Sequence, residues 1–316
     1  MDFGFSIPTR GPMANRHDLK ALAQKGEALG YEYLTVSDHI VIPKSFAPVY
    51  PYAADGKPTF PNAWLDQPTA LAWLAAVTEK ARLLTSVMVV PHRAPVHTAK
   101  VLATVDHLSE GRLVLGCGAG WMKEEFEALG AEDFEARGDV TDDYIRVFRK
   151  LWQEAEPHHD SPYASFSNIV FEPKPANGTI PIWIGGESPR ALRRTAELGD
   201  GWYPIGGNPS FPCATIAQYR ERAQALEAQA QKAGRDPGSI ARGYCANWGF
   251  KTPPFVLDGG ERFICTGSAN EIAGDIRDLA AAGVTTMIVN LVRNTVEESF
   301  DVMEWFRTEV RAQVED

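Results

Sequence analysis

The sequence predicts an α/β protein, a (β/α)8 TIM barrel with insertions at the C-terminal face of the barrel. The chain has 316 residues, which suits one barrel of about 250 residues with additions. Short β-rich runs alternate with helix-like stretches from end to end. The runs are uniformly apolar, as expected for parallel strands that are buried on both faces. We therefore expect a single domain over residues 1–316.

A recurring pattern marks four of the strands. A helix-like stretch ends in glycine, which supplies the left-handed turn that closes a helix, and an apolar run follows at once. These glycines are Gly30, Gly111, the pair in 199–201, and Gly283. Four further apolar runs bring the number to eight. The predicted strands lie near residues 3–8, 31–39, 82–90, 112–120, 181–186, 202–207, 241–250 and 284–292.

Helix start signals stand between these strands. Asn15 followed by Asp18 opens the first helix, and Ser188 followed by Pro189 opens another. Residues 268–271 read Ser-Ala-Asn-Glu, which is a capping box. The first helix also carries an apolar stripe suited to packing on a barrel, formed by Leu19, Leu22, Ala23 and Leu29.

Two stretches interrupt the plain repeat. Residues 40–66 carry five prolines, so we expect a long irregular loop on the C-terminal side of the second strand, where it would cover a substrate pocket. Its aromatic residues include Phe46, Tyr50, Tyr52, Phe60 and Trp64. Residues 156–180 predict a short hairpin or irregular arm before the fifth strand. Residues 206–212 could also close over a pocket.

Charge and cysteine content exclude several classes of partner. The chain has 31 basic and 41 acidic residues, a net charge of −10, which would repel nucleic acid and anionic membranes. We expect neither as a partner. The sequence contains no apolar run long enough to span a bilayer. The four cysteines are far apart, so neither a zinc site nor a disulfide framework is indicated, and a cytoplasmic location is expected.

The dipeptide Asp38–His39 ends the second predicted strand, where barrel enzymes place their chemistry. A histidine exchanges a proton near neutral pH, and a neighbouring aspartate could fix its position or tautomer. Adjacent strand residues point to opposite faces, however, so the two side chains need not touch. Packing at the strand end is the alternative. His158–His159 lies in the polar insertion and is interpreted as a solvated pair rather than as metal ligands, and no metal site is predicted.

Two glycine-rich turns are candidate binding segments. Residues 116–120 read GCGAG, which lacks the GxGxxG spacing of a dinucleotide site. Tight packing at a strand end and close approach to a flat cofactor both remain open. Gly185–Gly186 precedes the capped helix start at Ser188, and free amides there would suit a phosphate or carboxylate. A plain turn between strand and helix is the alternative.

Taken together, these segments resemble the bacterial luciferase-like monooxygenase family of oxidoreductases, in particular its branch that uses the deazaflavin coenzyme F-420. The similarity covers nearly the whole chain. It is carried by SDH at 37–39, the stretch from TSVMVV to GAGW at 85–121, EEFEALG at 124–130, and PIWIGGESPRALRRTAELGDGWYP at 181–204.

The resemblance implies a flavin-like ring at the C-terminal mouth of the barrel. It also implies that strand three ends in a bulge, often with a non-proline cis peptide, which presses against the ring at Ser86 and Val87. By the same resemblance Asp38 and His39 are catalytic and lie near the reactive edge. The implied cofactor-binding residues are Ser86, Val87, Gly116, Gly118 and Trp121, with the backbone of Gly185 and Gly186 at the phosphate.

The cofactor decides the type of reaction. A deazaflavin transfers hydride and reacts poorly with oxygen, whereas reduced FMN supports monooxygenation. Coenzyme F-420 has an anionic tail, so it requires local cations in this acidic chain. The candidates are Arg10, Arg93, Arg190, Arg193 and Arg194.

We therefore predict a cytoplasmic oxidoreductase that uses coenzyme F-420 for hydride transfer to or from a small, apolar organic substrate. The alternatives are an FMN-dependent luciferase-like monooxygenase and a barrel that binds a flavin without catalysis. A metal-dependent barrel hydrolase is disfavoured because no ligand spacing indicates one. A homodimer is expected.

Overall fold

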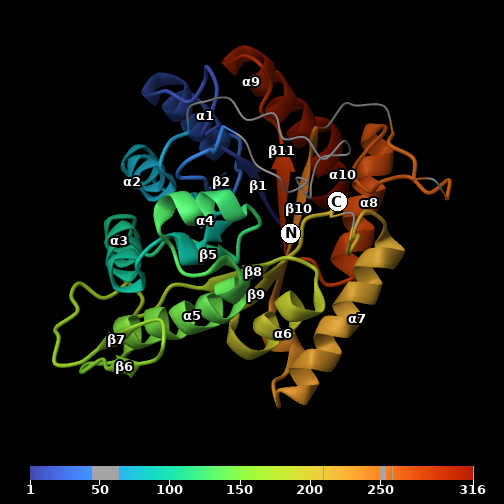
Figure 1. Cartoon of the computed structure of the whole chain (residues 1–316). Helices are drawn as coiled ribbons and strands as arrows, with labels where there is room; N and C mark the ends of the chain where they lie inside the picture. The colour runs from blue at the N-terminus through green and yellow to red at the C-terminus, as the bar shows by residue number, and fades with distance from the viewer. Residues whose placement is uncertain (45–63, 209, 250–253, 258, 316) are drawn as a thin grey trace.

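The computed structural model describes residues 1–44, 64–208, 210–249, 254–257 and 259–315. Parallel strands form a closed ring, because β1 (Asp2–Ser6) pairs with both β2 (Tyr33–Val36) and β11 (Thr286–Asn290). The ring continues through β3 (Arg82–Thr85) with β4 (Met88–Val89), β5 (Leu113–Gly118), β8 (Ile182–Gly185), β9 (Gly201–Tyr203) and β10 (Ala241–Gly249). Since β3 and β4 share one position, the predicted eight-position TIM barrel is confirmed (Figure 1).

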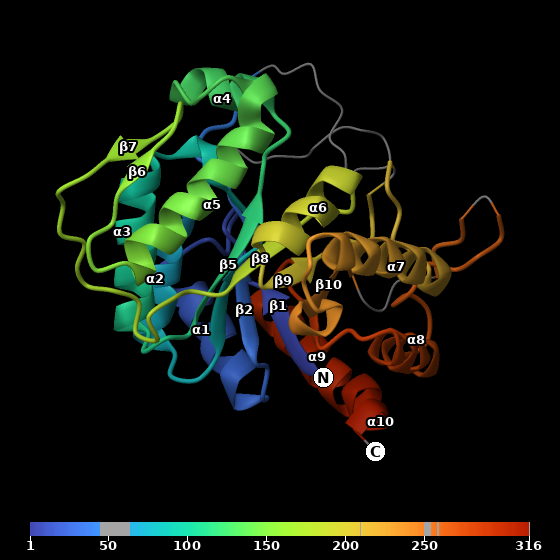
Figure 2. The ribbon, with the colours of Figure 1, turned by 90° about the horizontal axis from the view of Figure 1, so that it is seen from below.

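Helices surround this ring (Figure 2). Their bounds are α1 (Arg16–Ala28), α2 (Gln67–Val77), α3 (Pro95–Leu108), α4 (Lys123–Leu129), α5 (Arg137–Gln153), α6 (Pro189–Leu198), α7 (Ile216–Lys232), α8 (Ala269–Ala281), α9 (Val296–Trp305) and α10 (Ala312–Glu315). Shorter helical turns are η1 (Val90–His92), η2 (Phe134–Ala136), η3 (Pro237–Ser239) and η4 (Phe306–Arg311). The predicted caps at Asn15, at Ser188 and in the 268–271 box are all confirmed.

The glycine turns are confirmed at three of the four predicted places. Gly30, Gly111 and Gly283 have φ angles of 80°, 82° and 93°. Gly199 differs, because it ends α6 in extended backbone with φ of −88°. A Cβ on Gly199 would lie 2.8 Å from Ile184 Cγ1. This glycine is therefore required by close packing, and the prediction of a left-handed turn there is wrong.

The barrel separates two apolar cores. Inside the ring, side chains from alternate strand positions form a small cluster of Tyr33, Leu84, Val114, Trp183, Tyr203, Cys245 and Ile288. A larger cluster fills the space between the ring and the helices. All four cysteines are buried and free. The inner cluster forms the floor beneath the carboxyl ends of the strands.

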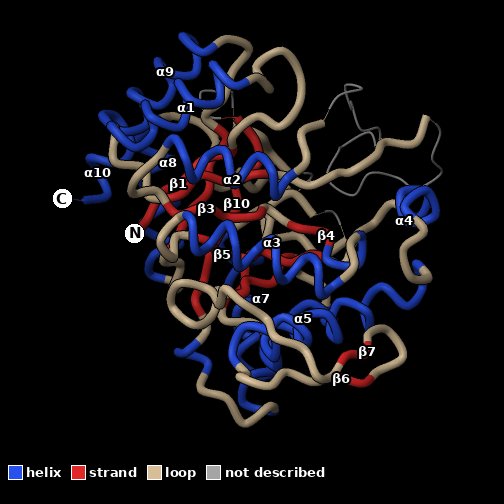
Figure 3. Tube along the Cα trace, turned by 90° about the vertical axis from the view of Figure 1, so that its left-hand side faces the viewer, coloured by secondary structure: helices blue, strands red, loops and turns tan. Residues whose placement is uncertain are grey.

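The insertion at 156–180 contains the predicted hairpin, formed by β6 (His159–Asp160) and β7 (Ser165–Phe166). The hairpin lies beside α5 in Figures 1 and 3. His158 is exposed, but His159 is buried and its Nε2 is 3.0 Å from Asp143 Oδ1 of α5. The prediction of a solvated histidine pair is therefore wrong for His159. Its contact with Asp143 attaches the hairpin to α5.

Most of the insertion at 40–66, including Phe46, Tyr50, Tyr52 and Phe60, lies outside the described residues. Trp64 is described and forms an isolated antiparallel bridge with Arg10. Among the helices that the structure describes, none has the length and hydropathy needed to cross a bilayer.

Candidate active site

A cavity of about 890 Å³ opens at the carboxyl ends of the strands. Segments that follow β1 and β2 line it, as do the break between β3 and β4 and the ends of β5, β8, β9 and β11. Cys245, in the middle of β10, also lines it. Asp38, His39, Ser86 and Val87 are among the lining residues, as are Gly118, Trp121, Gly185 and Gly186. The barrel therefore brings these sequence-predicted residues together at one mouth. Gly116 is the exception and does not line the cavity.

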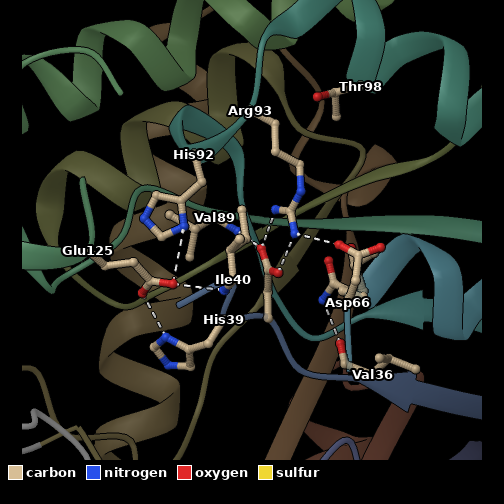
Figure 4. Close-up of polar contacts among 12 residues, drawn as sticks. Val36, His39, Ile40, Asp66, Val89, His92, Arg93, Thr98 and Glu125 are labelled. Carbon is tan, nitrogen blue, oxygen red and sulfur yellow. Dashed lines mark hydrogen bonds and ion pairs between the residues drawn. The ribbon is translucent and has the colours of Figure 1, made fainter. Parts of the chain in front are cut away.

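His39 is held by a glutamate from a different strand–helix unit. Its Nδ1 lies 2.7 Å from Oε2 of Glu125 on α4 (Figure 4). The other carboxylate oxygen accepts the backbone N–H groups of Ile40 at 2.8 Å and Val41 at 3.3 Å. Burial acts to raise the pKa of Glu125, but the hydrogen bond from His39 and the neighbouring charges outweigh it, so the pKa lies below its ordinary value. The ionised carboxylate only accepts, so Nδ1 of His39 is the donor of this hydrogen bond.

Sequence reasoning did not identify Glu125 as a site residue, although it lies in the EEFEALG segment. A signal was present. Glu124 and Glu125 both lie in the first turn of α4, followed by the buried Phe126. A helix shows only one face to the barrel, so one of two adjacent acids is expected to point inward.

His92 approaches the same carboxylate from the opposite side (Figure 4). Its Nδ1 is 3.9 Å from Glu125 Oε1, and neither ring nitrogen has a hydrogen-bond partner within the described chain. Its ring contacts Phe126 edge-on, with 4.6 Å between centroids. Burial lowers the pKa of His92 to about 4, so this imidazole is neutral at pH 7.

Asp38 does not contact His39 through the carboxylate. Instead its carboxylate accepts hydrogen bonds from both guanidinium Nη atoms of Arg93, each at 2.8 Å, and from the backbone N–H of Val89 at 2.9 Å. Its side chain is fully buried. The two-point ion pair ties the end of β2 to the segment just beyond the β3–β4 break, so Asp38 fixes the shape of this wall.

The break between β3 and β4 contains the cis Ser86–Val87 peptide that the resemblance implies. The Val87 side chain lies between two glycines. A Cβ on Gly118 would be 2.7 Å from Val87 Cγ2, and one on Gly185 would be 3.0 Å from Val87 Cγ1. These glycines therefore make room for the bulge.

Gly116 has a different role from the cofactor contact that was expected. A Cβ there would lie 2.1 Å from the backbone oxygen of Thr85, so Gly116 lets β3 and β5 approach. Of the alternatives for GCGAG, tight packing describes Gly116, and Gly118 both packs and lines the cavity.

A pair of hydroxyl groups joins the bulge to β9. Ser86 Oγ is 3.0 Å from the hydroxyl of Tyr203, which is buried at the end of β9. Burial raises the pKa of Tyr203 well above its ordinary value, so the phenol stays protonated at neutral pH.

Glu187 is a second acid that the sequence reasoning missed. It follows Gly186, whose φ is 105°, and its carboxylate accepts the backbone N–H of Ile205 and the side-chain amide of Asn208, both at 2.6 Å. It therefore joins the β8 loop to the loop after β9. Burial raises the pKa of Glu187 to about 7.

Most of the predicted cationic patch is neutralised elsewhere. Arg93 is paired with Asp38, and both Arg193 and Arg194 bind Asp142 of α5. Arg190 does not line the cavity, whereas Arg10 does. Arg293, which follows β11, lines it as well and was not among the candidates. Among the described residues, no group of three metal-ligating side chains is present.

These features define a (β/α)8 barrel with a preorganised histidine–carboxylate pair at the mouth where barrel enzymes hold their active sites. The family model for luciferase-like monooxygenases matches residues 1–247. The chain therefore belongs to the luciferase-like monooxygenase family.

The chain is similar to enzymes that use different cofactors. Over 168 residues it is 33% identical to a putative coenzyme F-420-dependent oxidoreductase of Mycobacterium tuberculosis. That alignment covers 47% of this chain and 46% of the other protein. The aligned stretch spans 65% of the length of the first curated relatives, which are uncharacterised mycobacterial proteins 30% identical over 187 residues.

Two solved structures share the fold. An F-420-dependent secondary alcohol dehydrogenase, in complex with an F-420–acetone adduct, aligns with a TM-score of 0.76 and 18% identity over 100% of this chain and 99% of that one. The oxygenating constituent of 3,6-diketocamphane monooxygenase from Pseudomonas putida, in complex with FMN, aligns with a TM-score of 0.71 and 15% identity over 99% of each chain.

Proposed function

We propose that this chain is an oxidoreductase that binds coenzyme F-420 at the mouth of the barrel and transfers hydride to or from a small organic substrate with an apolar body. The observation that carries the proposal is the His39–Glu125 pair, held at a cavity wall that the Ser86–Val87 bulge also forms. Two proteins similar to this chain are described as F-420-dependent, one of them putatively, and they support this cofactor.

The described residues fit a flavin-like group. The cavity volume lies in the upper part of the 300–1,000 Å³ range of ordinary ligand sites, which suits a ring and a substrate together. Val87, Gly118 and Trp121 would hold the ring. The backbone of Gly185 and Gly186, just before the capped start of α6, would hold the phosphate region.

The chain's own contribution is the handling of a proton. When bound, a deazaflavin supplies or accepts the hydride. His39 supplies or removes the accompanying proton at Nε2, and ionised Glu125 keeps Nδ1 protonated so that only Nε2 exchanges. Asp38 holds Arg93 and the Val89 amide, and thereby keeps the bulge and His39 in fixed relation.

Equilibrium binding of coenzyme F-420 and of FMN, each oxidised and reduced, tests the proposal. The measurement uses purified protein and follows absorbance or fluorescence. Micromolar or tighter binding of the deazaflavin with weaker binding of FMN is the expected result. The reverse preference would replace hydride transfer with FMN-dependent monooxygenation, which the FMN complex of the 3,6-diketocamphane enzyme favours as the second candidate. Binding of neither would overturn the assigned function.

The remaining alternatives have less support. A barrel that binds flavin without catalysis has no need of a buried glutamate that fixes a histidine tautomer. A metal-dependent hydrolase needs a ligand cluster, and the described part of the chain contains none. We further propose a cytoplasmic location, which suits four free buried thiols.

A further inference from the structure

His92 is a buried polar side chain to which the proposed function gives no role. It ends η1, just beyond β4, and its side chain is 2% exposed. Neither of its ring nitrogens has a hydrogen-bond partner among the described residues. Buried polar groups without a partner are rare because each loses its hydrogen bonds to water and gains nothing in return. A histidine at this position therefore requires a reason.

The ring of His92 lies between an apolar neighbour and a charged one. It contacts Phe126 of α4 edge-on, with 4.6 Å between the centroids. Its Nδ1 is 3.9 Å from Oε1 of Glu125, on the side of that carboxylate opposite His39 (Figure 4). An apolar side chain could fill this space without burying two polar nitrogens. The nitrogen that faces Glu125 is therefore what distinguishes a histidine here.

The charge of His92 decides what it can offer to Glu125. Burial has the largest effect on its pKa and lowers it to about 4, so the ring is neutral at pH 7. Of the titratable groups that face it, Glu125 and Asp38 act to raise this pKa, whereas Arg93 and His39 lower it further. A neutral imidazole has one N–H donor and one acceptor nitrogen. Because an ionised carboxylate only accepts, the proton is expected on Nδ1, which faces Glu125.

In the described part of the chain, the hydrogen bonds that reach the Glu125 carboxylate all come from one segment. His39 Nδ1 donates at 2.7 Å, and the backbone N–H groups of Ile40 and Val41 donate at 2.8 Å and 3.3 Å. A shift of this segment would weaken all three together. A donor on His92 comes from η1 and is independent of it. A cationic side chain there would compete with His39 for the carboxylate, whereas a neutral N–H stabilises the carboxylate and leaves its charge in place.

We propose that His92 is a positioning residue that acts through Glu125. Its Nδ1–H is directed at Oε1, and it keeps the carboxylate ionised and in the orientation that holds His39. The inference rests on the proposed function, in which the His39–Glu125 pair handles the proton. Hydrogen bonds of catalytic groups commonly shorten once substrate is bound. An approach from 3.9 Å to the usual length of about 2.9 Å would complete this one.

The tautomer of His92 tests the proposal in the wild-type protein without any cofactor. Long-range proton–nitrogen NMR of protein with isotope-labelled histidine reports which ring nitrogen carries the proton, and the loss of one signal in His92→Asn assigns it. At pH 7 we expect a neutral ring with its proton on Nδ1. A proton on Nε2, or a charged ring, overturns the proposal.

Exchange of the His39 Nδ1 proton with water measures the effect on the pair. His92→Leu removes the donor and should make this exchange about tenfold faster. His92→Asn keeps an N–H near the position of Nδ1, so its exchange rate should stay close to that of the wild type. His159→Leu removes a buried histidine that binds Asp143 instead, and it controls for a general loss of stability, which thermal unfolding measures in each variant. Equal exchange rates in His92→Leu and the wild type, or no recovery in His92→Asn, overturn the proposal.

Turnover of the cofactor-bound enzyme provides the last test. His92→Leu should lower kcat about tenfold and leave KM nearly unchanged, and His92→Asn should restore most of the loss. Unchanged kcat in His92→Leu overturns the proposal. Failure of the wild-type protein to bind either cofactor contradicts the proposed function alone, because the tautomer and the exchange rate are measured without cofactor.

Discussion

At the scale of single residues, the site depends on which atoms of the buried polar groups carry a proton. Glu125 is almost fully buried, yet its charge is supported by His39 and by two backbone N–H groups. The histidine was evident as a candidate because it ends a strand. The glutamate was not, because nothing in a single helix indicates which strand end it faces.

Replacement of Glu125 by Gln should lower turnover about 10- to 100-fold and leave cofactor affinity nearly unchanged. Gln keeps the shape but removes the charge that fixes the His39 tautomer. His39→Asn should lower turnover further, by about 10²- to 10⁴-fold, because it removes the proton donor itself. The checks are kcat, its pH profile and cofactor titration. Glu127→Gln changes an exposed acid of the same helix and serves as the control. Unchanged turnover in His39→Asn would remove that residue from the mechanism.

His92 makes stability depend on pH on the acid side. Its pKa is about 4 in the folded chain and 6.5 ordinarily, because burial disfavours the charged ring. Between these values the unfolded chain binds a proton that the folded chain does not. The contribution of neutral His92 to the free energy of unfolding is therefore fully present above pH 6.5. It is lost as the pH falls toward 4, by about 3 kcal/mol in all. Urea unfolding from pH 4.5 to 8 should show a smaller loss in His92→Leu, whereas parallel curves for the two proteins would contradict this origin.

At the scale of elements, the β3–β4 bulge is built by its neighbours. Val87 fills the space that Gly118 of β5 and Gly185 of β8 leave open. Three strands therefore set the shape of one wall. The loop after β9 is attached to the same region through Glu187, which bonds Ile205 and Asn208.

Gly118→Ala should disturb this wall. The φ angle of Gly118 lies outside the left-handed region, so alanine fits the backbone, but its Cβ would lie 2.7 Å from Val87 Cγ2. We expect a loss of about 1–3 kcal/mol in stability and at least tenfold weaker cofactor binding, measured by urea unfolding and fluorescence titration. Gly138→Ala in α5 is the control, because its Cβ would meet Arg194 only at 3.5 Å. An equal effect of both variants on cofactor binding would contradict a local role for the bulge.

At the scale of the whole molecule, the first and last strands close the ring. Gly4 of β1 lies against Tyr33 of β2, and a Cβ on Gly4 would be 2.4 Å from Tyr33 Cβ and 2.5 Å from its backbone oxygen. Neither atom can move without a shift of β2. Gly4→Ala should therefore destabilise the chain by about 3 kcal/mol while unfolding stays a single transition in urea. A urea midpoint equal to that of the wild type would show that the contact between β1 and β2 tolerates a side chain at position 4.

Assembly is also a property of the whole molecule. We propose a homodimer, as the resemblance to the luciferase-like family implies. Sedimentation equilibrium at micromolar concentration should give the mass of two chains. The mass of one chain under those conditions would contradict the proposal.

Much of the architecture was determined by the sequence itself. Glycine-ended helices, continuous apolar strands and capping residues such as Asn15 and Ser188 act over a few neighbouring residues, so their effect could be predicted locally. The strand-end position of His39 and the family segments around Ser86 and Val87 indicated the site in the same way. The mouth of the barrel then follows from the eightfold alternation, because parallel strands place their carboxyl ends together.

The tertiary structure alone decided which groups meet at that mouth. Glu125 reaches His39, and the segments after β1 and β11 both line the cavity, because ring closure brings together segments that are far apart along the chain. The same closure neutralises Arg93 and Arg194 through Asp38 and Asp142, so it removes cations that composition counted as available. Gly116 and Gly199 serve contacts with other strands for the same reason. Local sequence sets the conformation of each segment, whereas hydrogen bonds and charge pairing depend on distances that only the closed barrel fixes.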